Sequence, residues 1–495
     1  MGSDYSRLYF SYRFIVAILG CLGIAAIYTM EACLTVAIVA MTKPIPIPNH
    51  NNTTDIQCHF NTTDVYVTKH QGKFSWNQKT QSLVLSAFFY GYTFSQILGG
   101  LLSDRYGGKI MATFGSLTCA ILTLFMPLCA DISVYLFTAT RFLQGILQGI
   151  FYPAVLTVTS RWCTTAEKTI FMAIVSSGSN LGIFVSQSLS GYLSNLQMLN
   201  SWQLPFYVFG GFTIIWAIFW IIFTSNNPSE NRFISSSERE LLMRCSETKI
   251  PESQSSSIPW IKVVTSLPLI GLCIGSFGLE LNAQIVFNLF PTYLYNVLGV
   301  QLNTNGIMSS IPFILFWVGV VVGGLITDII RNRWLSTIAT RRLMFFTGCL
   351  MTAAFNIMIR IADCNYVVVV VFVSLSLFCT GVCLTQTIAN CVEVFPKFVG
   401  LTSGIMNSFA NSTGVFSPNI GYLITNKNIH SKNRWQTVFD FTSGFFFISG
   451  GICVLLMQAN PVKWASNYEE LSNNKSGEDG NSDSTEEENI KAFIN

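Results

Sequence analysis

Three ionisable side chains, Glu31, Arg141 and Glu280, lie inside long apolar stretches of the sequence. A charge near the middle of a bilayer costs about 2.5–3.5 kcal/mol on insertion scales, so such residues are retained where they face a wet cavity or a partner. The forked guanidinium of an arginine can hold a carboxylate or a phosphate through two hydrogen bonds. Arg141 is therefore the candidate for binding an anionic group. The alternative is an arginine near a helix end that reaches the outer membrane surface.

The two carboxyl groups are candidates for coupling and charge balance. Glu31 and Glu280 can each act as a proton carrier, a cation ligand or an ion-pair partner of Arg141. A buried carboxyl group without a partner tends to be protonated, which suits proton coupling. For Glu31 the structural alternative is a permanent ion pair with Arg141.

Polar side chains in otherwise apolar segments add candidates for a substrate cavity. Asn282 and Asn288 follow Glu280 and give that segment a polar face, whose alternative role is hydrogen bonding between helices. Tyr90 and Asn407 lie in two further segments that carry polar side chains. Such segments are tolerated at membrane depth where they border protein or water. These four residues are predicted to line the cavity together with Arg141.

The elements that must position these residues are membrane helices. The chain has 495 residues, of which 51% are hydrophobic and only 11% are charged, whereas about a quarter are charged in a soluble protein. About 20 apolar residues span the hydrocarbon core. Twelve segments qualify, near 14–41, 80–102, 110–130, 133–158, 170–195, 204–224, 267–297, 305–329, 343–361, 365–390, 399–424 and 436–457. The sequence predicts an all-α membrane protein with twelve transmembrane helices in two six-helix halves, 14–224 and 266–457.

The distribution of Lys and Arg predicts the orientation. These residues are more frequent on the side that holds both chain ends, which is therefore predicted to be cytoplasmic. The cytoplasmic segments are then 1–13, the central loop 225–265 and the tail 458–495. The tail is rich in Ser, Asn, Asp and Glu and is predicted to be disordered. The outer loop 42–79 carries glycan acceptor sequons at Asn51, Asn52 and Asn61.

Other chemistries lack the residues that they need. The net charge of +3 gives no basic surface for nucleic acid. The four histidines fall in predicted outer loops without a metal-ligand spacing, and no phosphate-binding glycine loop is present, so neither a metal, a cofactor nor an enzyme activity is predicted. Most of the 14 cysteines lie in apolar segments as small packing residues. Only Cys58 and Cys364 fall in predicted outer loops, where they could form a disulfide.

A charged turn occurs twice, at matching places in the two halves. The first copy carries Asp104, Arg105 and Lys109 after the second predicted helix, and the second carries Asp328 and Arg331 after the eighth. Such an internal repeat is expected of transporters built from two related halves. Both turns are predicted to make and break ion pairs when the halves rock.

The motifs together resemble one family of membrane transporters. They include the Asp104 turn, Leu34–Met41 at the end of the first helix, Arg161-Trp162 after the fourth, and Trp435–Phe439 in the last. This pattern is similar to the anion:cation symporters of the major facilitator superfamily, the group of sialin, the vesicular glutamate transporters and the sodium-phosphate transport proteins. The resemblance implies a monomer in the plasma membrane or an endolysosomal or vesicular membrane. It also implies alternating-access transport of a small anion, driven by a proton, a sodium ion or the membrane potential.

Two departures from the family pattern bear on the substrate. Many members carry an arginine where this chain has Glu31, and the glutamate-type members carry an acidic residue where it has Gln148. The resemblance then implies the branch that moves phosphate, urate or organic carboxylates, with Gln148 and Glu31 in the coupling group. A lysosomal exporter of acidic sugars and a membrane sensor without transport are the alternatives.

Overall fold

The computed structural model describes residues 11–43, 58, 72–164, 168–196, 201–247, 259–362, 364–462 and 464. Within these ranges twelve helices have 20 or more residues. The first six are α2 (Tyr12–Met41), α4 (Gln78–Tyr106), α5 (Gly108–Ile132), α6 (Val134–Arg161), α7 (Lys168–Leu193) and α8 (Leu204–Phe223). The second six are α11 (Leu267–Asn296), α12 (Leu302–Arg333), α13 (Thr337–Met358), α14 (Tyr366–Val394), α15 (Val399–Thr425) and α16 (Lys432–Leu456). The prediction of two six-helix sets is confirmed.

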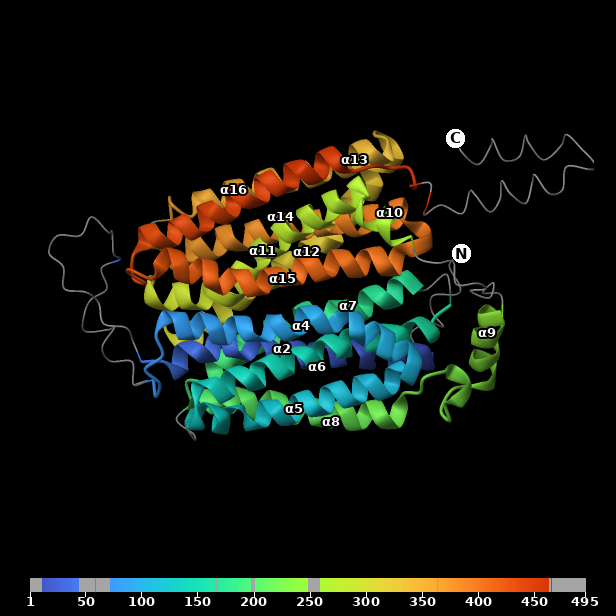
Figure 1. The fold of residues 1–495 in the computed structure, drawn as a ribbon, viewed down its shortest axis with the longest axis horizontal. Helices are drawn as coiled ribbons and strands as arrows, with labels where there is room; N and C mark the ends of the chain where they lie inside the picture. The colour runs from blue at the N-terminus through green and yellow to red at the C-terminus, as the bar shows by residue number, and fades with distance from the viewer. Residues whose placement is uncertain are drawn as a thin grey trace, which may run out of the picture.

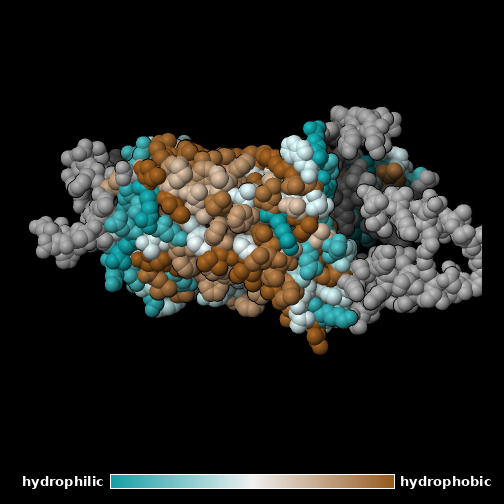
Figure 2. Space-filling view, turned by 90° about the horizontal axis from the view of Figure 1, so that it is seen from above, coloured by the Kyte–Doolittle hydropathy of each residue, from teal (hydrophilic) through white to brown (hydrophobic). Residues whose placement is uncertain are grey.

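The helices run side by side in two bundles (Figure 1). The N-terminal half, in blue to green, lies along the C-terminal half, in yellow to red, and a hydrophobic belt separates two hydrophilic ends (Figure 2). Eight of the twelve helices are long and apolar enough to cross a membrane by length and composition. The other four are α4, α7, α13 and α15. Three of these, α4, α7 and α15, take part in the two largest contacts between the halves, α4 with α15 and α7 with α12, so they border protein as well as lipid.

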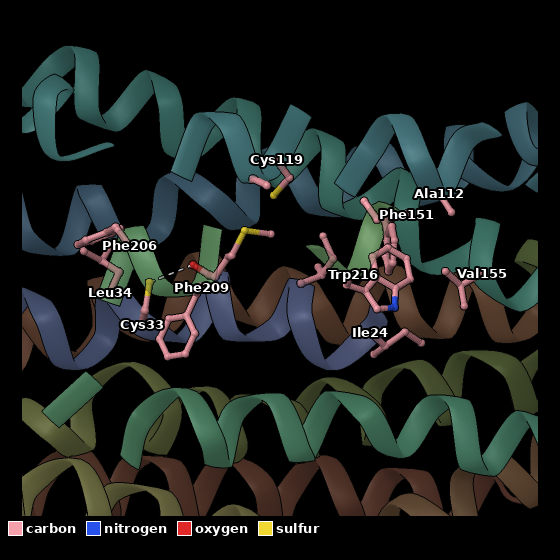
Figure 3. Close-up of a cluster of buried hydrophobic side chains, with 14 of the residues drawn as sticks. Ile24, Cys33, Leu34, Ala112, Cys119, Phe151, Val155, Phe206, Phe209 and Trp216 are labelled. Carbon is pink, nitrogen blue, oxygen red and sulfur yellow. Dashed lines mark hydrogen bonds between the residues drawn. The ribbon is translucent and has the colours of Figure 1, made fainter. Parts of the chain in front are cut away.

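The core of the N-terminal half is a cluster of apolar side chains from α2, α5, α6 and α8 (Figure 3). Trp216 of α8 lies beside Phe151 in this cluster and donates a hydrogen bond from its indole nitrogen to the carbonyl of Leu19, at 2.9 Å. Cys33 and Cys119 are fully buried in this cluster. They fill small gaps between the helices, as their apolar sequence context predicts.

The central segment between the halves contains helices that hydropathy does not predict. The helix α9 (Ser236–Glu247) lies beside the start of α2, and α10 (Trp260–Val264) leads into α11. The carboxylate of Glu238 in α9 accepts hydrogen bonds from the backbone N–H groups of Tyr12 and Arg13, at 3.1 and 3.0 Å. An anion at the start of a helix stabilises the unpaired N–H groups there, so α9 is attached to the N-terminal half.

The two halves touch at one end of the molecule, which we call the loop end because it holds the α2–α4 connection. Asn419 of α15 joins the hydroxyls of Ser82 and Ser86 of α4, at 2.9 and 3.1 Å. The hydroxyls of Ser188 in α7 and Ser310 in α12 are 2.7 Å apart. These contacts close the loop end.

A disulfide between Cys58 and Cys364 also joins the halves at the loop end, across 306 residues of sequence. Cys364 lies in the α13–α14 connection. Cys58 is packed against apolar residues of the C-terminal half. The bridge that the sequence left open is therefore present.

At the opposite end, which we call the terminus end, the same helix faces lie apart. Gly100 of α4 and Gly404 of α15 continue the faces that meet at the loop end. A Cβ atom added at either glycine would find no atom within 4 Å. The start of α2 and the end of α16 lie at this end (Figure 1). Contacts between the halves therefore hold the loop end together, whereas Gly100 and Gly404 have free space beside them at the terminus end.

Candidate functional site

Arg141 lies in the interior of the N-terminal half and is 2% exposed. Its guanidinium donates a hydrogen bond from Nη1 to Oε1 of Gln144 at 2.8 Å, and one from Nη2 to the backbone carbonyl of Glu31 at 3.5 Å. The guanidinium carbon is 5.0 Å from the centre of the Phe88 ring. This burial rules out the alternative of an arginine that reaches the membrane surface.

Arg141 forms no direct ion pair, although the carboxylate of Glu31 lies within electrostatic range of it. Within the described residues no carboxylate oxygen lies within 4.0 Å of its nitrogens. Its Nε is buried and has no hydrogen-bond partner. A buried cation without an anionic partner is costly, and a bound anion would offset that cost.

Gln144 fixes the position of the guanidinium. Its amide nitrogen donates to the hydroxyl of Thr123 in α5 at 3.1 Å and to the backbone carbonyl of Met30 in α2 at 3.4 Å. Its amide oxygen is thereby turned toward Arg141. Groups from three helices therefore orient the guanidinium. Of Arg141 and Gln144, the sequence predicted only Arg141 as a site residue. The position of Gln144 one turn after Arg141 is the signal that could have identified it.

Glu31 lies next to this group and is 4% exposed. Its carboxylate accepts a hydrogen bond from Nε2 of Gln148, with 2.6 Å between the atoms. The amide oxygen of Gln148 is buried and has no partner. The permanent ion pair between Glu31 and Arg141, the structural alternative, is therefore not formed, because Gln148 occupies the carboxylate and Gln144 occupies the guanidinium.

Glu280 lies on α11 in the other half, close enough to Glu31 for the two carboxyl groups to interact electrostatically. Gln284 donates to its carboxylate at 3.2 Å. Asn288 continues this row one turn further and donates to Gln284 and to Ser417 of α15, each at 3.1 Å. The predicted polar face of α11 thus exists, and at Asn288 it bonds to a neighbouring helix.

Asn282 lies on a different side of α11 from this row. Its amide nitrogen donates to Thr380 at 3.0 Å and to Ser376 at 3.4 Å, and its oxygen accepts from Asn356 at 2.9 Å. These partners belong to α13 and α14 of the same half. The geometry favours hydrogen bonding between helices over cavity lining for Asn282.

Two predicted cavity residues lie outside the Arg141 group. Tyr90 is 44% exposed on α4, and Asn407 is exposed on α15, where its backbone carbonyl accepts from Asn411 at 2.8 Å. Their role in the cavity stays a prediction. Instead, Tyr28 and Tyr92 lie near Glu31, with their hydroxyls 3.4 Å apart.

The two charged turns both lie at the terminus end. Arg105 stacks on Tyr106, with 5.4 Å between the guanidinium carbon and the ring centre, and the backbone N–H of Lys109 donates to Asn226 at 2.9 Å. Asp104 lies in the last turn of the same helix, which ends at Tyr106. In the second copy Asp328 and Arg331 form an ion pair at 3.3 Å.

The C-terminal half carries its own buried arginine near the second turn. Arg341 of α13 pairs with Glu393 of α14 at 2.7 Å and donates to Gln386 at 3.0 Å. Unlike Arg141, this arginine has a carboxylate partner. We therefore infer that Arg341 has a structural role.

Some predicted sites lie beyond what the structure describes, and no metal site emerges within it. The sequon residues Asn51, Asn52 and Asn61 lie outside the described residues. Within the described ranges, no group of three His, Cys, Asp or Glu side chains is placed to hold a metal ion.

Comparisons with known proteins agree with this architecture. A family model described as Major Facilitator Superfamily matches residues 20–418 and, in a second match, 272–486. The chain is 32% identical to sialin of Ovis aries over 458 residues, which cover 92% of this chain and 91% of that protein. It is 28% identical to sodium-dependent phosphate transport protein 3 of Homo sapiens over 405 residues, 80% of this chain and 91% of the relative.

Solved structures share the fold at low sequence identity. The crystal structure of a bacterial homologue of the human lysosomal transporter Spinster, inward-facing and occupied, superimposes with a TM-score of 0.68. The two chains are 14% identical, and the match covers 90% of this chain and 97% of that one. This likeness concerns the fold alone.

Proposed function

Because the chain belongs to the Major Facilitator Superfamily, we propose that it carries small anions across a membrane by alternating access. Its similarity to sialin and to a sodium-dependent phosphate transport protein agrees with the anion:cation symporter group. The proposed substrates are phosphate, urate or organic carboxylates. The halves would rock about a central site and expose it to each side in turn.

The observation that carries the proposal is the state of Arg141. This arginine is buried and held by Gln144, and it lacks a carboxylate partner among the described residues. A fixed guanidinium with a spare donor is suited to a carboxylate or a phosphate. In the present state Phe88 covers one face of the guanidinium, so we propose that this ring moves when the anion enters.

The arrangement of the halves supports the transport cycle. The Ser188–Ser310 contact closes the loop end, while Gly100 and Gly404 have no neighbours at the terminus end. We propose that these two glycine-bearing faces meet in the opposite state. The Asp104 and Asp328 turns lie where that contact would form, which suits their proposed role as gates.

The proposed coupling ion is a proton or a sodium ion, with the membrane potential as a further source of energy. Glu31 is the group that would exchange the proton, because its carboxylate has only a neutral hydrogen-bond partner in Gln148. A single charge that crosses 100 mV changes the free energy by about 2.3 kcal/mol. Voltage alone would then support accumulation of an anion.

The orientation and assembly are part of the proposal. The excess of Lys and Arg on the side of the chain ends supports cytoplasmic termini and glycans on the outer loop at Asn51, Asn52 or Asn61. We propose a functional monomer in the plasma membrane or in an endolysosomal or vesicular membrane. A shift in gel mobility after glycosidase treatment, abolished when the three asparagines are replaced by Gln, tests the orientation.

The decisive experiment is uptake by the purified full-length protein in liposomes. Labelled phosphate, urate and glutamate are offered under proton, sodium and voltage gradients that are imposed separately. We expect uptake by the parent, loss of uptake in Arg141→Ala, and unchanged uptake in Arg333→Ala, which removes an exposed arginine. Equal uptake by the Arg141 and Arg333 variants would assign the anion site elsewhere.

An acidic sugar is the second candidate substrate, because the chain is 32% identical to sialin over 92% of its length. Labelled sialic acid is therefore included in the same assay. Uptake of sialic acid in preference to the other anions would assign this class. Failure of every anion to move under every gradient would refute transport of anions and favour a membrane sensor.

A further inference from the structure

The amide of Gln148 is satisfied on one side only. Its Nε2 donates to the carboxylate of Glu31 at 2.6 Å. Its Oε1 is buried without a hydrogen-bond partner, and Gln148 as a whole is 1% exposed. A buried acceptor left unpaired is unfavourable, so this half of the amide marks a place where another group belongs.

The ionisation state of Glu31 determines which sides of this amide its carboxyl group can hold. An ionised carboxylate only accepts hydrogen bonds, so it holds the donor side of the amide, as in the structure. A protonated carboxyl group gains one O–H donor, which pairs with the acceptor side of an amide. The same two residues therefore have two hydrogen-bonded arrangements, related by a half-turn of the Gln148 amide.

We propose that Gln148 is a proton-controlled switch that converts protonation of Glu31 into affinity for the anion. The Glu31 carboxylate takes one proton from water, and the new O–H donates to Oε1 of Gln148. The amide turns over, and its Nε2 moves to the place that Oε1 now occupies. The position that now holds an acceptor without a donor then holds a donor without an acceptor. A bound anion supplies the missing acceptor.

The charges of the site change in the same direction. With Glu31 ionised, its negative charge and the positive charge of Arg141 sum to zero. Uptake of one proton leaves a net charge of +1, which a monovalent anion balances. Arg141 has an unpaired Nε and donates to the backbone carbonyl of Glu31, while Gln148 donates to its carboxylate, so the cation and the amide both bond to Glu31.

The surroundings of Glu31 contain few other groups that titrate. Those in electrostatic range come from the helices packed around it: Arg141 of α6, Glu280 of α11, Tyr92 of α4, Cys119 of α5, and Tyr28 of α2 itself. The helices α7 and α8 present neutral hydroxyls to nearby carbonyls of α2, from Ser186 at 2.7 Å and Thr213 at 3.5 Å. Glu280 already has a hydrogen-bond donor in Gln284. We therefore assign the unpaired acceptor of the Gln148 amide to Glu31.

The inference rests on the proposed function and predicts how anion affinity depends on pH. Hydrogen bonds to charged groups are worth enough to change an affinity by about tenfold or more. The parent should therefore bind the anion about tenfold more tightly at pH 5.5 than at pH 7.5. A binding advantage that is present at low pH and lost as Glu31 ionises is the sign required for symport of a proton with an anion.

The test measures binding of labelled phosphate, urate and sialic acid to the purified full-length protein at both pH values. Glu31→Gln places a neutral amide donor opposite Gln148, and we expect it to bind with the low-pH affinity at both pH values. Gln148→Met keeps the length of the side chain without the amide, and we expect weak binding with little pH dependence. Each variant is compared with the parent at the same pH, which cancels ionisation of the anion itself.

The outcomes separate this inference from the proposed function. If Gln148→Met and Gln148→Leu keep the full pH dependence of the parent, the charge of Glu31 acts alone and the switch is refuted. If the parent binds no anion at either pH, the proposed function fails first. Gln148→Leu serves as the second variant should Gln148→Met not fold, with thermal unfolding as the check on folding.

Discussion

A side chain at Gly306 should prevent the loop end from closing. Gly306 of α12 packs against α7 so closely that an added Cβ would lie 2.5 Å from the carbonyl oxygen of Gln187 and 2.8 Å from the Cα of Gly191. Both obstacles are backbone atoms of a packed helix, so they cannot turn aside as a flexible side chain can. Overpacking of this kind costs about 1–3 kcal/mol. Gly306→Ala should therefore lower the ratio of closed to open molecules about 5- to 150-fold, at about tenfold per 1.4 kcal/mol.

The closed state can be measured by cross-linking Ser188→Cys with Ser310→Cys, because the two hydroxyls are 2.7 Å apart when the loop end is closed. Gly211→Ala is the matched control, since a Cβ on this helix residue meets no atom within 4 Å. Both substitutions bring the same gain in helix propensity, about 1 kcal/mol. We expect fast cross-linking in the control and cross-linking at least fivefold slower with Gly306→Ala. Equal rates would refute the tight α7–α12 contact as the closure.

Three further predictions concern stability and the site. Glu393→Ala leaves the buried Arg341 without its partner, and should lower the free energy of unfolding by about 1–3 kcal/mol. Asp440→Ala breaks an exposed pair and should change the stability far less. Thermal unfolding in detergent compares the two variants, and equal losses would contradict the argument. Cys364→Ser should lower the unfolding temperature of the oxidised protein only, and an equal loss under reducing conditions would count against a bridge. Gln144→Leu should weaken anion binding about tenfold, because it frees the guanidinium that the amide holds, and unchanged binding in the equilibrium assay would remove Gln144 from the site.

Hydropathy identified the twelve membrane helices because each must satisfy its own backbone in lipid. It missed α9 because that helix lies outside the membrane and its sequence is mostly polar. Its contact through Glu238 with the start of α2 spans 226 residues. No local pattern encodes such a contact, so a sequence-based reading treats the segment as a loop. The same holds for the disulfide, since the sequence offers two candidate cysteines but not their distance.

In the candidate site, too, the sequence identifies some of the residues but not their partners. The sequence singled out Arg141 and Glu31 because charges are rare in apolar helices. Their actual partners, Gln144 and Gln148, are neutral and common residues. Gln144 bonds to Arg141 within α6, and only the packing of α2 against α6 brings Gln148 to Glu31. Asn282 was predicted as cavity lining from its helix face. The rotation of α11 turns it toward α13 and α14 instead, which a polar pattern alone does not specify.

The Cys58–Cys364 disulfide gives the two halves a second covalent connection, so that the chain and the disulfide together form a ring. The chain itself joins the halves through the segment between α8 and α11, and the disulfide joins them again at the loop end. A protease that cuts between α8 and α11 would therefore release no fragment, and the nicked molecule would migrate as one species until a reductant separates the halves. Two halves expressed as separate chains would be joined covalently by the same disulfide once its two cysteines are oxidised.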